Sequence, residues 1–322
     1  MPRIVTLLAA ATEIVAAVGA GEELVGVSHE CDHPPGAVAS RPVLTRARVG
    51  PLPSSADVDR SVRQLVADAL AVYDIDTELL AALAPDVIVT QDLCRVCAVS
   101  VDDVRAAVAR RQRKADVALV SLHPRRLGDI LGDIARVADA AGRPAAGERV
   151  VAGLQDRIEH VRTVTSGAPH RPRVVTVEWI EPVLLGGLWM PELIELAGGE
   201  PLGAAAGAPA PTVARDVLAR LAPDVVLVKP CGFTVERTLA ELPVLARTLP
   251  WRAWTGPGGG AARVYVADGN AYFNRSGPRI VDSLELLAAL LHPGRFPDQA
   301  ARLGGAAVQI DPDLAVLPAT TT

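Results

Sequence analysis

The sequence predicts an α/β fold made of two related Rossmann-like lobes joined by a long helix. Three observations support this prediction: the chain has 322 residues, short β-branched runs alternate with segments of helical periodicity, and a strand motif recurs in each half. We place the N-terminal lobe at 1–123, a helical spine with its linker at 124–171, the C-terminal lobe at 172–295 and a tail at 296–322. Each lobe is long enough to bury a core of its own.

Composition limits the class of partner. Hydrophobic residues make up 50% of the chain, 21% are charged and the net charge is −5, which is ordinary for a globular protein without a basic patch. Aromatic residues make up only 3%. We therefore expect no nucleic-acid surface, because such surfaces need clustered basic residues or aromatic stacking platforms. No apolar stretch reaches the roughly 18 residues that a membrane-spanning helix needs.

The first expected elements are a strand at 3–8 and a helix at 12–18 that stops at Gly19. An export signal is the competing interpretation, because a basic residue precedes an apolar run rich in alanine. Thr12 and Glu13 interrupt that run, which favours a folded strand and helix. We therefore expect a cytoplasmic protein, or an exported one if the true start of the chain lies upstream.

An internal repeat indicates that the two lobes are related. Residues 83–89 (LAPDVIV) recur as 221–228 (LAPDVVLV), and each copy has the pattern of a helix end, a Pro-Asp turn and a buried strand. Residues 3–6 (RIVT) similarly resemble 173–176 (RVVT). Because the two matches occur in the same order, they indicate two copies of one arrangement of strands and helices.

The segment between the lobes has the spacing of a helix. Apolar residues recur at helical intervals from Pro124 to about Val164, with an interruption at 142–144 (GRP). We expect two helices or one kinked helix here, followed by a polar linker at 165–172. Such a spine would hold the lobes at a nearly fixed separation, unlike a flexible linker. After Pro293 the regular pattern fades.

The candidate site lies in the loops after the strands, because parallel α/β sheets bind ligands beyond the carboxyl ends of their strands. These loops hold all four cysteines of the chain: Cys31, Cys94, Cys97 and Cys231. One hypothesis is that they converge on zinc or an iron–sulfur cluster, since thiolates bind both and a Cys-x-x-Cys pair can chelate. The alternative is a set of separate thiols, of which the Cys-x-x-Cys pair could be redox-sensitive.

The same loops supply candidate contacts for an organic ligand. His29 could ligate a metal or act as an axial base to a metal inside a cofactor, or it could cap the following turn. Trp179, Tyr272 and Phe273 offer the aromatic surface that a large planar ligand needs. The polar candidates are Glu30, Glu178 and Arg275. We expect the other three tryptophans to pack inside their lobe: Trp189, Trp251 and Trp254.

Several motifs resemble those of the cobalamin- and iron–siderophore-type substrate-binding proteins of ABC transporters. The first of these motifs are 6–14 (TLLAAATEI), 25–28 (VGVS) and 83–88 (LAPDVI), and the resemblance continues through 198–200 (GGE) and 276–280 (SGPRI). It therefore covers nearly the whole chain and is most similar to the vitamin B12-binding branch. The resemblance implies a class III periplasmic-binding-protein fold whose two lobes, joined by a rigid helix, grip a corrinoid in the cleft between them.

The resemblance also implies roles for individual residues. The family's loop of aromatic residues and arginines matches 272–279 (YFNRSGPR), which supports the aromatic and arginine contacts expected above. Acidic residues that dock to arginines of the membrane permease match Glu200 and, more loosely, Asp102 or Asp103. The chain departs from the family where alanines at 9–11 replace its usual proline, and in the cysteine loops. These departures suggest a cytoplasmic variant whose ligand has changed.

Two functions are therefore expected. The first is non-catalytic binding of cobalamin or a related corrinoid or metal-containing cofactor for uptake or trafficking, with an ABC-transporter permease as candidate partner. The second is a metal- or iron–sulfur-dependent enzyme that uses the cysteines, with Glu178 or Glu181 handling protons. The sequence has no nucleophile elbow, phosphate-binding glycine loop or His-Glu-x-x-His motif, which favours binding over catalysis.

Overall fold

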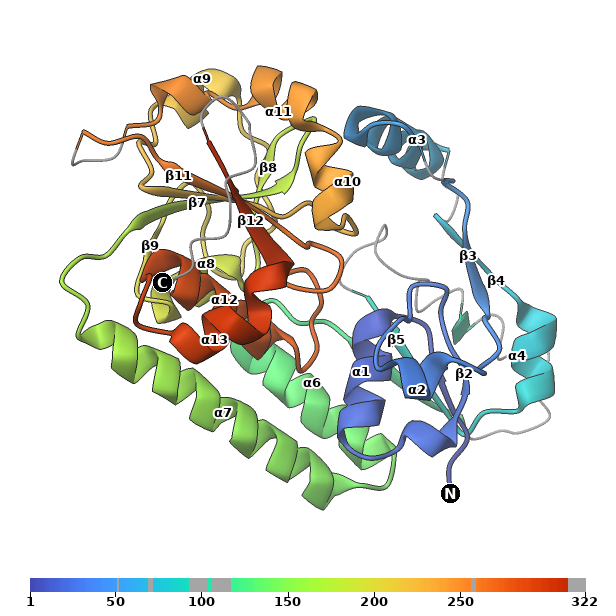
Figure 1. The fold of residues 1–322 in the computed structure, drawn as a ribbon. Helices are drawn as coiled ribbons and strands as arrows, with labels where there is room; N and C mark the ends of the chain where they lie inside the picture. Colours follow the sequence, from blue (N-terminus) through green and yellow to red (C-terminus); the bar gives the residue numbers. More distant parts are fainter. Residues whose placement is uncertain (51, 69–71, 93–103, 106–116, 256–258, 312–322) are drawn as a thin grey trace. The chain divides into compact units, whose positions relative to one another are not determined.

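A computed structural model describes residues 1–50, 52–68, 72–92, 104–105, 117–255 and 259–311. The chain divides into two compact units, both of mixed α/β architecture (Figure 1). Unit 1 comprises Met1–Pro53, Asp57–Pro124 and Gly128–Leu154, and unit 2 comprises Ser54–Ala56, Arg125–Leu127 and Gln155–Thr322. The predicted α/β class is confirmed. No helix among these residues is long and apolar enough to cross a membrane.

Unit 1 is built on a four-stranded parallel sheet of order β2-β1-β5-β6. Its strands are β1 (Ile4–Thr6), β2 (Leu24–Gly26), β5 (Val87–Gln91) and β6 (Ala118–Leu122). A separate antiparallel pair consists of β3 (Thr45–Ala47) and β4 (Tyr73–Ile75). The helices of this unit are α1 (Ala9–Ala17), η1 (Gly21–Glu23), α2 (Pro35–Val38), α4 (Thr77–Leu83) and α6 (Leu127–Ala140). Three helices have residues in both units: α6 through Leu127, α3 (Ser55–Ala67) and α7 (Pro144–Ser166).

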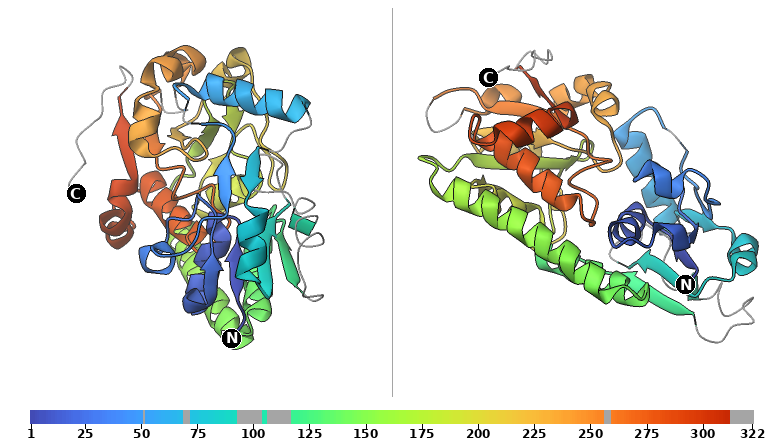
Figure 2. Two further views of the ribbon diagram at one scale, coloured as in Figure 1. Left: turned by 90° about the vertical axis from the view of Figure 1, so that its right-hand side faces the viewer. Right: turned by 60° about the horizontal axis from the view of Figure 1, so that its bottom comes forward.

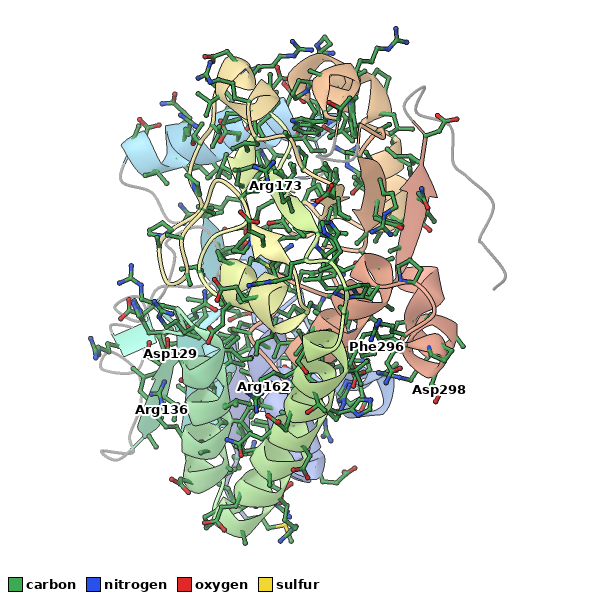
Figure 3. All side chains as sticks on the ribbon, turned by 90° about the vertical axis from the view of Figure 1, so that its left-hand side faces the viewer. Asp129, Arg136, Arg162, Arg173, Phe296 and Asp298 are labelled. Carbon is green, nitrogen blue, oxygen red and sulfur yellow. The ribbon has the colours of Figure 1, made fainter. Side chains whose placement is uncertain are left out.

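The central strands β1 and β5 are buried along their whole length, as expected of parallel strands that are covered on both faces. Helix α6, on which Figure 3 labels Asp129 and Arg136, is tied to the neighbouring strand β6. The guanidinium of Arg136 donates two hydrogen bonds to the carbonyl oxygen of Ser121, both at 3.0 Å. These contacts hold α6 against the edge of the sheet.

The expected interruption of the helical segment is confirmed. Helix α6 ends at Ala140, Gly142 has a φ of +70°, and α7 begins at Pro144. The two helices pack side by side where α7 begins (Figure 2), and a Cβ placed on Gly147 would lie 2.5 Å from that of Ala138. Glycine is therefore required at this crossing, because no larger residue fits between the two backbones.

Unit 2 is built on a six-stranded sheet of order β12-β11-β10-β7-β8, with β9 also paired to β7. Its strands are β7 (Arg173–Trp179), β8 (Leu184–Leu185), β9 (Glu200–Pro201), β10 (Val225–Val228), β11 (Arg263–Ala267) and β12 (Ala307–Ile310). Its helices are α8 (Met190–Leu196), α9 (Arg215–Ala219), α10 (Val235–Leu239), α11 (Leu242–Thr248), η2 (Trp251–Ala253), α12 (Ile280–Leu291), α13 (Pro297–Leu303) and η3 (Gly304–Ala306). Strands β7, β10 and β11 run parallel, whereas β8 and β12 run antiparallel to their neighbours.

One face of the unit 2 sheet carries the main core cluster. Alternate residues of β7, β10 and β11 point to this face, as the two-residue period of a strand requires, and they pack against Trp251 and Trp254. Both indole N–H groups are satisfied, by the carbonyl oxygens of Leu245 and Leu218 at 2.9 and 2.8 Å. Trp189 is also buried. The prediction that these three tryptophans pack inside their unit is confirmed.

The internal repeat is visible as the same hydrogen-bonded turn in both units. The carboxylate of Asp86 accepts the backbone N–H of Arg3 at 2.8 Å, and that of Asp224 accepts the backbone N–H of Arg173 at the same distance. In both copies the alanine before the Pro-Asp pair has a positive φ, 41° and 46°. Strand β1 pairs with β5 as β7 pairs with β10, both parallel. Each aspartate thus fixes the start of two neighbouring strands.

The end of the chain differs from the prediction. The segment from 296 was expected to be a tail, but it forms α13 and then β12, which pairs antiparallel with β11. Figure 3 labels Phe296 and Asp298 at the start of α13, and Phe296 is buried. The short apolar run at 307–310 is too brief to show periodicity, so its pairing could not be recognised from the sequence.

Candidate functional site

A buried lysine lies at the carboxyl end of the unit 2 sheet. Lys229 follows directly after β10, and its side chain is 0% exposed. The ammonium donates to Oε2 of Glu178 at 3.0 Å and to Oδ1 of Asn274 at 2.6 Å. Glu178 is the penultimate residue of β7, and its side chain remains 27% exposed. The two oxygens offset the large desolvation cost of burying an ammonium.

Asn274 is held so that its side-chain oxygen accepts a hydrogen bond from the Lys229 ammonium. Its Nδ2 donates to the carbonyl oxygens of Lys229 and Gly269 at 3.0 and 2.9 Å, so its Oδ1 must face the ammonium. The backbone is packed tightly here, since a Cβ on Gly269 would lie 2.1 Å from the carbonyl oxygen of Pro230. None of the described residues hydrogen-bonds to Oε1 of Glu178. The cluster formed by Lys229, Glu178 and Asn274 thus presents a fixed, partly exposed carboxylate oxygen.

Aromatic side chains lie beside this cluster. The ring of Trp179 is partly buried and tilted at 59° against that of Phe233, with centroids 5.3 Å apart. The guanidinium of Arg237 stacks on Phe233 at 4.8 Å from the ring centroid. The indole N–H of Trp179 is buried and has no hydrogen-bond partner among the described residues. Trp179 is partly exposed and remains a candidate ligand contact.

The loop after β11 corrects part of the prediction. Phe273 is 0% exposed; its backbone N–H donates to the hydroxyl of Ser283, and its carbonyl oxygen accepts the indole N–H of Trp189. Its ring is therefore a core side chain and offers no surface to a ligand. Arg275 is also buried and donates to Oδ1 of Asn270 at 3.3 Å, which suits loop support better than direct ligand contact. Tyr272 stays partly exposed.

In unit 1, the loop after β2 carries the predicted histidine. His29 is exposed, and its Nδ1 lies 2.7 Å from the hydroxyl oxygen of Thr45, which also accepts the backbone N–H of His29 at 3.0 Å. The ring is tilted at 45° against that of Tyr73, with centroids 5.4 Å apart. Tyr73 in turn donates its hydroxyl proton to Glu30 at 3.3 Å. Partial burial of the ring lowers the pKa of His29, which favours neutral imidazole.

Cys31 is held as a neutral thiol. It is partly buried, its sulfur accepts a hydrogen bond from the hydroxyl of Thr12 at 2.9 Å, and Thr12 lies 2.6 Å from the hydroxyl of Thr6. Burial raises the pKa of the Cys31 thiol, although the hydrogen bond from Thr12 opposes that rise. Thiolate is the form that binds metals and attacks electrophiles, so this environment suits neither role at neutral pH.

The remaining cysteines do not form a site within the described part of the chain. Cys231 is exposed in the loop after β10, whereas Cys94 and Cys97 lie outside the described residues. No group of three or more histidine, cysteine or acidic side chains suited to a metal ion occurs among the residues that the structure describes. The predicted convergence of the four cysteines on zinc or an iron–sulfur cluster remains a prediction.

The structure describes only one of the two positions that were expected to dock a permease. Glu200 is exposed at the start of β9, where its backbone N–H donates to the carbonyl oxygen of Pro172. Asp102 and Asp103, the candidates for the other position, lie outside the described residues. Their docking role stays a prediction.

Sequence reasoning missed the residues that hold the candidate side chains Glu178 and His29 in place. Lys229 directly follows a fully apolar strand, but lysine is almost never fully buried, so its burial could not be read from the sequence. Asn274 and Thr45 gave no signal either, since each lies far along the chain from its partner.

Comparisons with known proteins agree with this architecture. A family model described as "Periplasmic binding protein" matches residues 4–248. The vitamin B12-binding protein of Vibrio cholerae is 24% identical over 291 residues, which cover 90% of this chain and 88% of that protein.

Solved structures are similar over comparable lengths. A periplasmic haem-binding protein from Pseudomonas aeruginosa has a TM-score of 0.65 at 19% identity, covering 91% of this chain and 94% of its own. The periplasmic vitamin B12-binding protein of Vibrio cholerae has a TM-score of 0.61 at 20% identity, covering 90% and 96%. At these identities the structural likeness establishes the fold alone.

Proposed function

Because the chain belongs to the periplasmic binding protein family, we propose that it binds cobalamin or a related corrinoid for uptake or trafficking. The family places it among the substrate-binding proteins of ABC transporters, which favours a binding role over catalysis. A relative that binds vitamin B12 aligns with nearly the whole chain, and structural neighbours bind either vitamin B12 or haem. The choice between these two ligands depends on the chemistry of the site.

The observation that supports a corrinoid is the orientation of Glu178 by Lys229 and Asn274. The corrin ring carries amide side chains, whose N–H groups are donors, whereas haem carries two carboxylates. A fixed carboxylate oxygen accepts hydrogen bonds from amides and repels carboxylates. The ammonium of Lys229 is already engaged by Glu178 and Asn274, so its charge is largely compensated. This part of the site therefore suits a periphery of amides.

Aromatic surface complements the polar cluster. Trp179 and Tyr272 are both partly exposed next to these loops, and their rings can pack against the apolar rim of a macrocycle. The guanidinium of Arg279 lies 5.7 Å from the centroid of the Tyr272 ring and supports it from one side.

Equilibrium dialysis against cyanocobalamin and against haemin tests the proposal. We expect cyanocobalamin to bind, and Glu178→Gln to weaken it about tenfold, since a hydrogen bond to a charged group contributes about 1.5 kcal/mol or more. Glu195→Gln is the matched control, because Glu195 is an exposed residue of α8. Retention of haemin without cyanocobalamin would reject the corrinoid and indicate a haem-binding protein instead.

We also propose that Glu200 docks to a permease, because it is exposed and matches the family's acidic position. Glu200→Ala should leave cyanocobalamin binding unchanged and abolish transport in cells that depend on this protein and its permease. Transport at the wild-type rate would reject this role.

A further inference from the structure

We infer that Lys229 is a positioning residue which, by fixing Glu178, restricts the ligand to macrocycles whose peripheral carboxylic acids have been converted into amides. This assignment rests on the proposed function, because it needs a ligand with such a periphery. It goes further by naming the residue that sets the selectivity and by excluding the acid forms of the same ring. It follows that amide formation on the ring must precede binding by this protein.

The backbone fixes the positions of Glu178 and Lys229. The backbone N–H of Lys229 donates to the carbonyl oxygen of Val177 at 2.9 Å, which continues the pairing of β7 with β10. The backbone N–H of Cys231 donates in turn to the carbonyl oxygen of Glu178 at 3.1 Å. The loop after β11 packs tightly against the same place, because a Cβ on Gly269 would lie 2.7 Å from the carbonyl oxygen of Lys229. Neither side chain can therefore be displaced by a shift of its own backbone alone.

The ammonium of Lys229 decides which oxygen of Glu178 is left for a ligand. It is 0% exposed, and it donates to Oε2 of Glu178 at 3.0 Å and to Oδ1 of Asn274 at 2.6 Å. Asn274 is itself held, because its Nδ2 donates to two backbone carbonyl oxygens. Oε1 is thus the acceptor that remains, on a side chain that is 27% exposed. An acceptor held in this way binds a donor with little further loss of side-chain freedom.

This acceptor distinguishes an amide from an acid at the same place on the ring. A carboxylate oxygen accepts hydrogen bonds and cannot donate them, so it needs a donor from the ligand. An amide supplies an N–H group, whereas a carboxylate supplies none and repels Glu178. Sites built to pair with a donor reject the analogue that lacks it, because their polar group is then left unpaired. Since water can reach the partly exposed Glu178, we expect a selectivity of at least about tenfold rather than the larger factors of a fully buried site.

Two arginines of unit 2 that could attract a carboxylate are already engaged. Arg237 donates to Oε1 of Glu241 at 3.0 Å, and its guanidinium stacks on the ring of Phe233. Arg275 is buried and donates to Oδ1 of Asn270 at 3.3 Å. A carboxylate on the ligand has to displace an existing partner to pair with either of them, which favours the neutral amide further.

Dicyanocobinamide and dicyanocobyrinic acid are the probes, because they share the ring and its metal, and the first carries amides where the second carries free acids. Equilibrium dialysis of the full-length protein in about 1 M NaCl, where the Debye length is about 3 Å, suppresses repulsion by the net charge of −5. We expect cobinamide to bind at least about tenfold more tightly than cobyrinic acid. Glu178→Gln should lower this ratio at least about tenfold, because a glutamine amide can donate to a carboxylate. Glu195→Gln, in an exposed residue of α8, removes the same charge and should leave the ratio unchanged.

Lys229 is tested by the same ratio in Lys229→Met. Methionine fills a similar volume and leaves the carboxylate of Glu178 free to turn toward water. The ratio should fall about two- to tenfold, which corresponds to the cost of ordering one side chain on binding. A loss of structure alone would weaken both ligands equally, so a variant that binds both less tightly at an unchanged ratio would overturn the positioning role of Lys229.

The outcomes also separate this inference from the proposed function. If cobinamide is retained but cobyrinic acid binds as tightly, or if Glu178→Gln leaves the ratio unchanged, the selectivity is refuted and corrinoid binding stands. If neither probe nor cyanocobalamin is retained, the proposed function fails and the inference fails with it.

Discussion

Removing the charge from either member of the Lys229–Glu178 pair should destabilise unit 2 by different amounts. In Glu178→Gln, the ammonium of Lys229 stays charged at 0% exposure and cannot be hydrated. Loss of a partner at a fully buried ion pair costs about 3–5 kcal/mol, and the partial exposure of Glu178 reduces our expectation to about 2–3 kcal/mol. In Lys229→Met, the carboxylate can turn toward water, because its side chain is 27% exposed. We expect a cost of about 1 kcal/mol there.

The double variant sharpens this prediction. With Gln at 178 and Met at 229, no charge is left buried, so the cost should fall back toward that of Lys229→Met alone. Urea denaturation followed by tryptophan fluorescence is the suitable assay, because all four tryptophans lie in unit 2. Equal costs for the two single variants, or a double variant as unstable as the sum of both, would refute the reasoning.

Three further predictions concern single side chains. Phe273→Ala should destabilise unit 2 by about 3–5 kcal/mol in the same urea assay, and by clearly more than Tyr272→Ala, because only Phe273 is fully buried. Iodoacetamide at pH 7.5 should alkylate Cys231 faster than Cys31, because Cys231 is exposed and burial raises the pKa of the Cys31 thiol. Mass spectrometry of peptides measures both rates, and faster alkylation of Cys31 would contradict the prediction that its thiol is held neutral. Burial lowers the pKa of His292 below its ordinary 6.5, so the unfolded chain binds the proton more readily and stability falls as pH drops below about 6.5. His292→Gln should flatten that dependence in urea titrations at several pH values.

The strands were the most predictable part of the fold. Apolar, β-branched runs such as the one at Val225–Val228 identify buried parallel strands, and the repeated Pro-Asp turn identifies the related halves. The aspartate of each turn accepts a hydrogen bond from the neighbouring strand, which explains why the motif occurs twice. Helix α1 was expected at Thr12 but begins at Ala9, since alanine continues a helix without any boundary signal.

The candidate site was predicted only in part. The rule that ligands bind beyond the carboxyl ends of strands pointed to Glu178, which the structure places as the penultimate residue of β7, and to the loop of His29; both residues are at least partly exposed. It could not reveal that Phe273 turns into the core, because the direction of a loop side chain depends on backbone geometry; this residue has a φ of +63°. Nor could it reveal Thr45 or Asn274, whose roles arise from contacts between distant parts of the chain.

Strand β12 has a consequence for solubility. It covers the edge of β11, whose backbone N–H and carbonyl groups would otherwise be unpaired along one side. Open edges of this kind recruit strands from other molecules, and native proteins shield them. Strand β12 is itself the outermost strand and has four residues, so it replaces the five-residue edge of β11 by a shorter one and limits the length of backbone with which a strand of another molecule could pair.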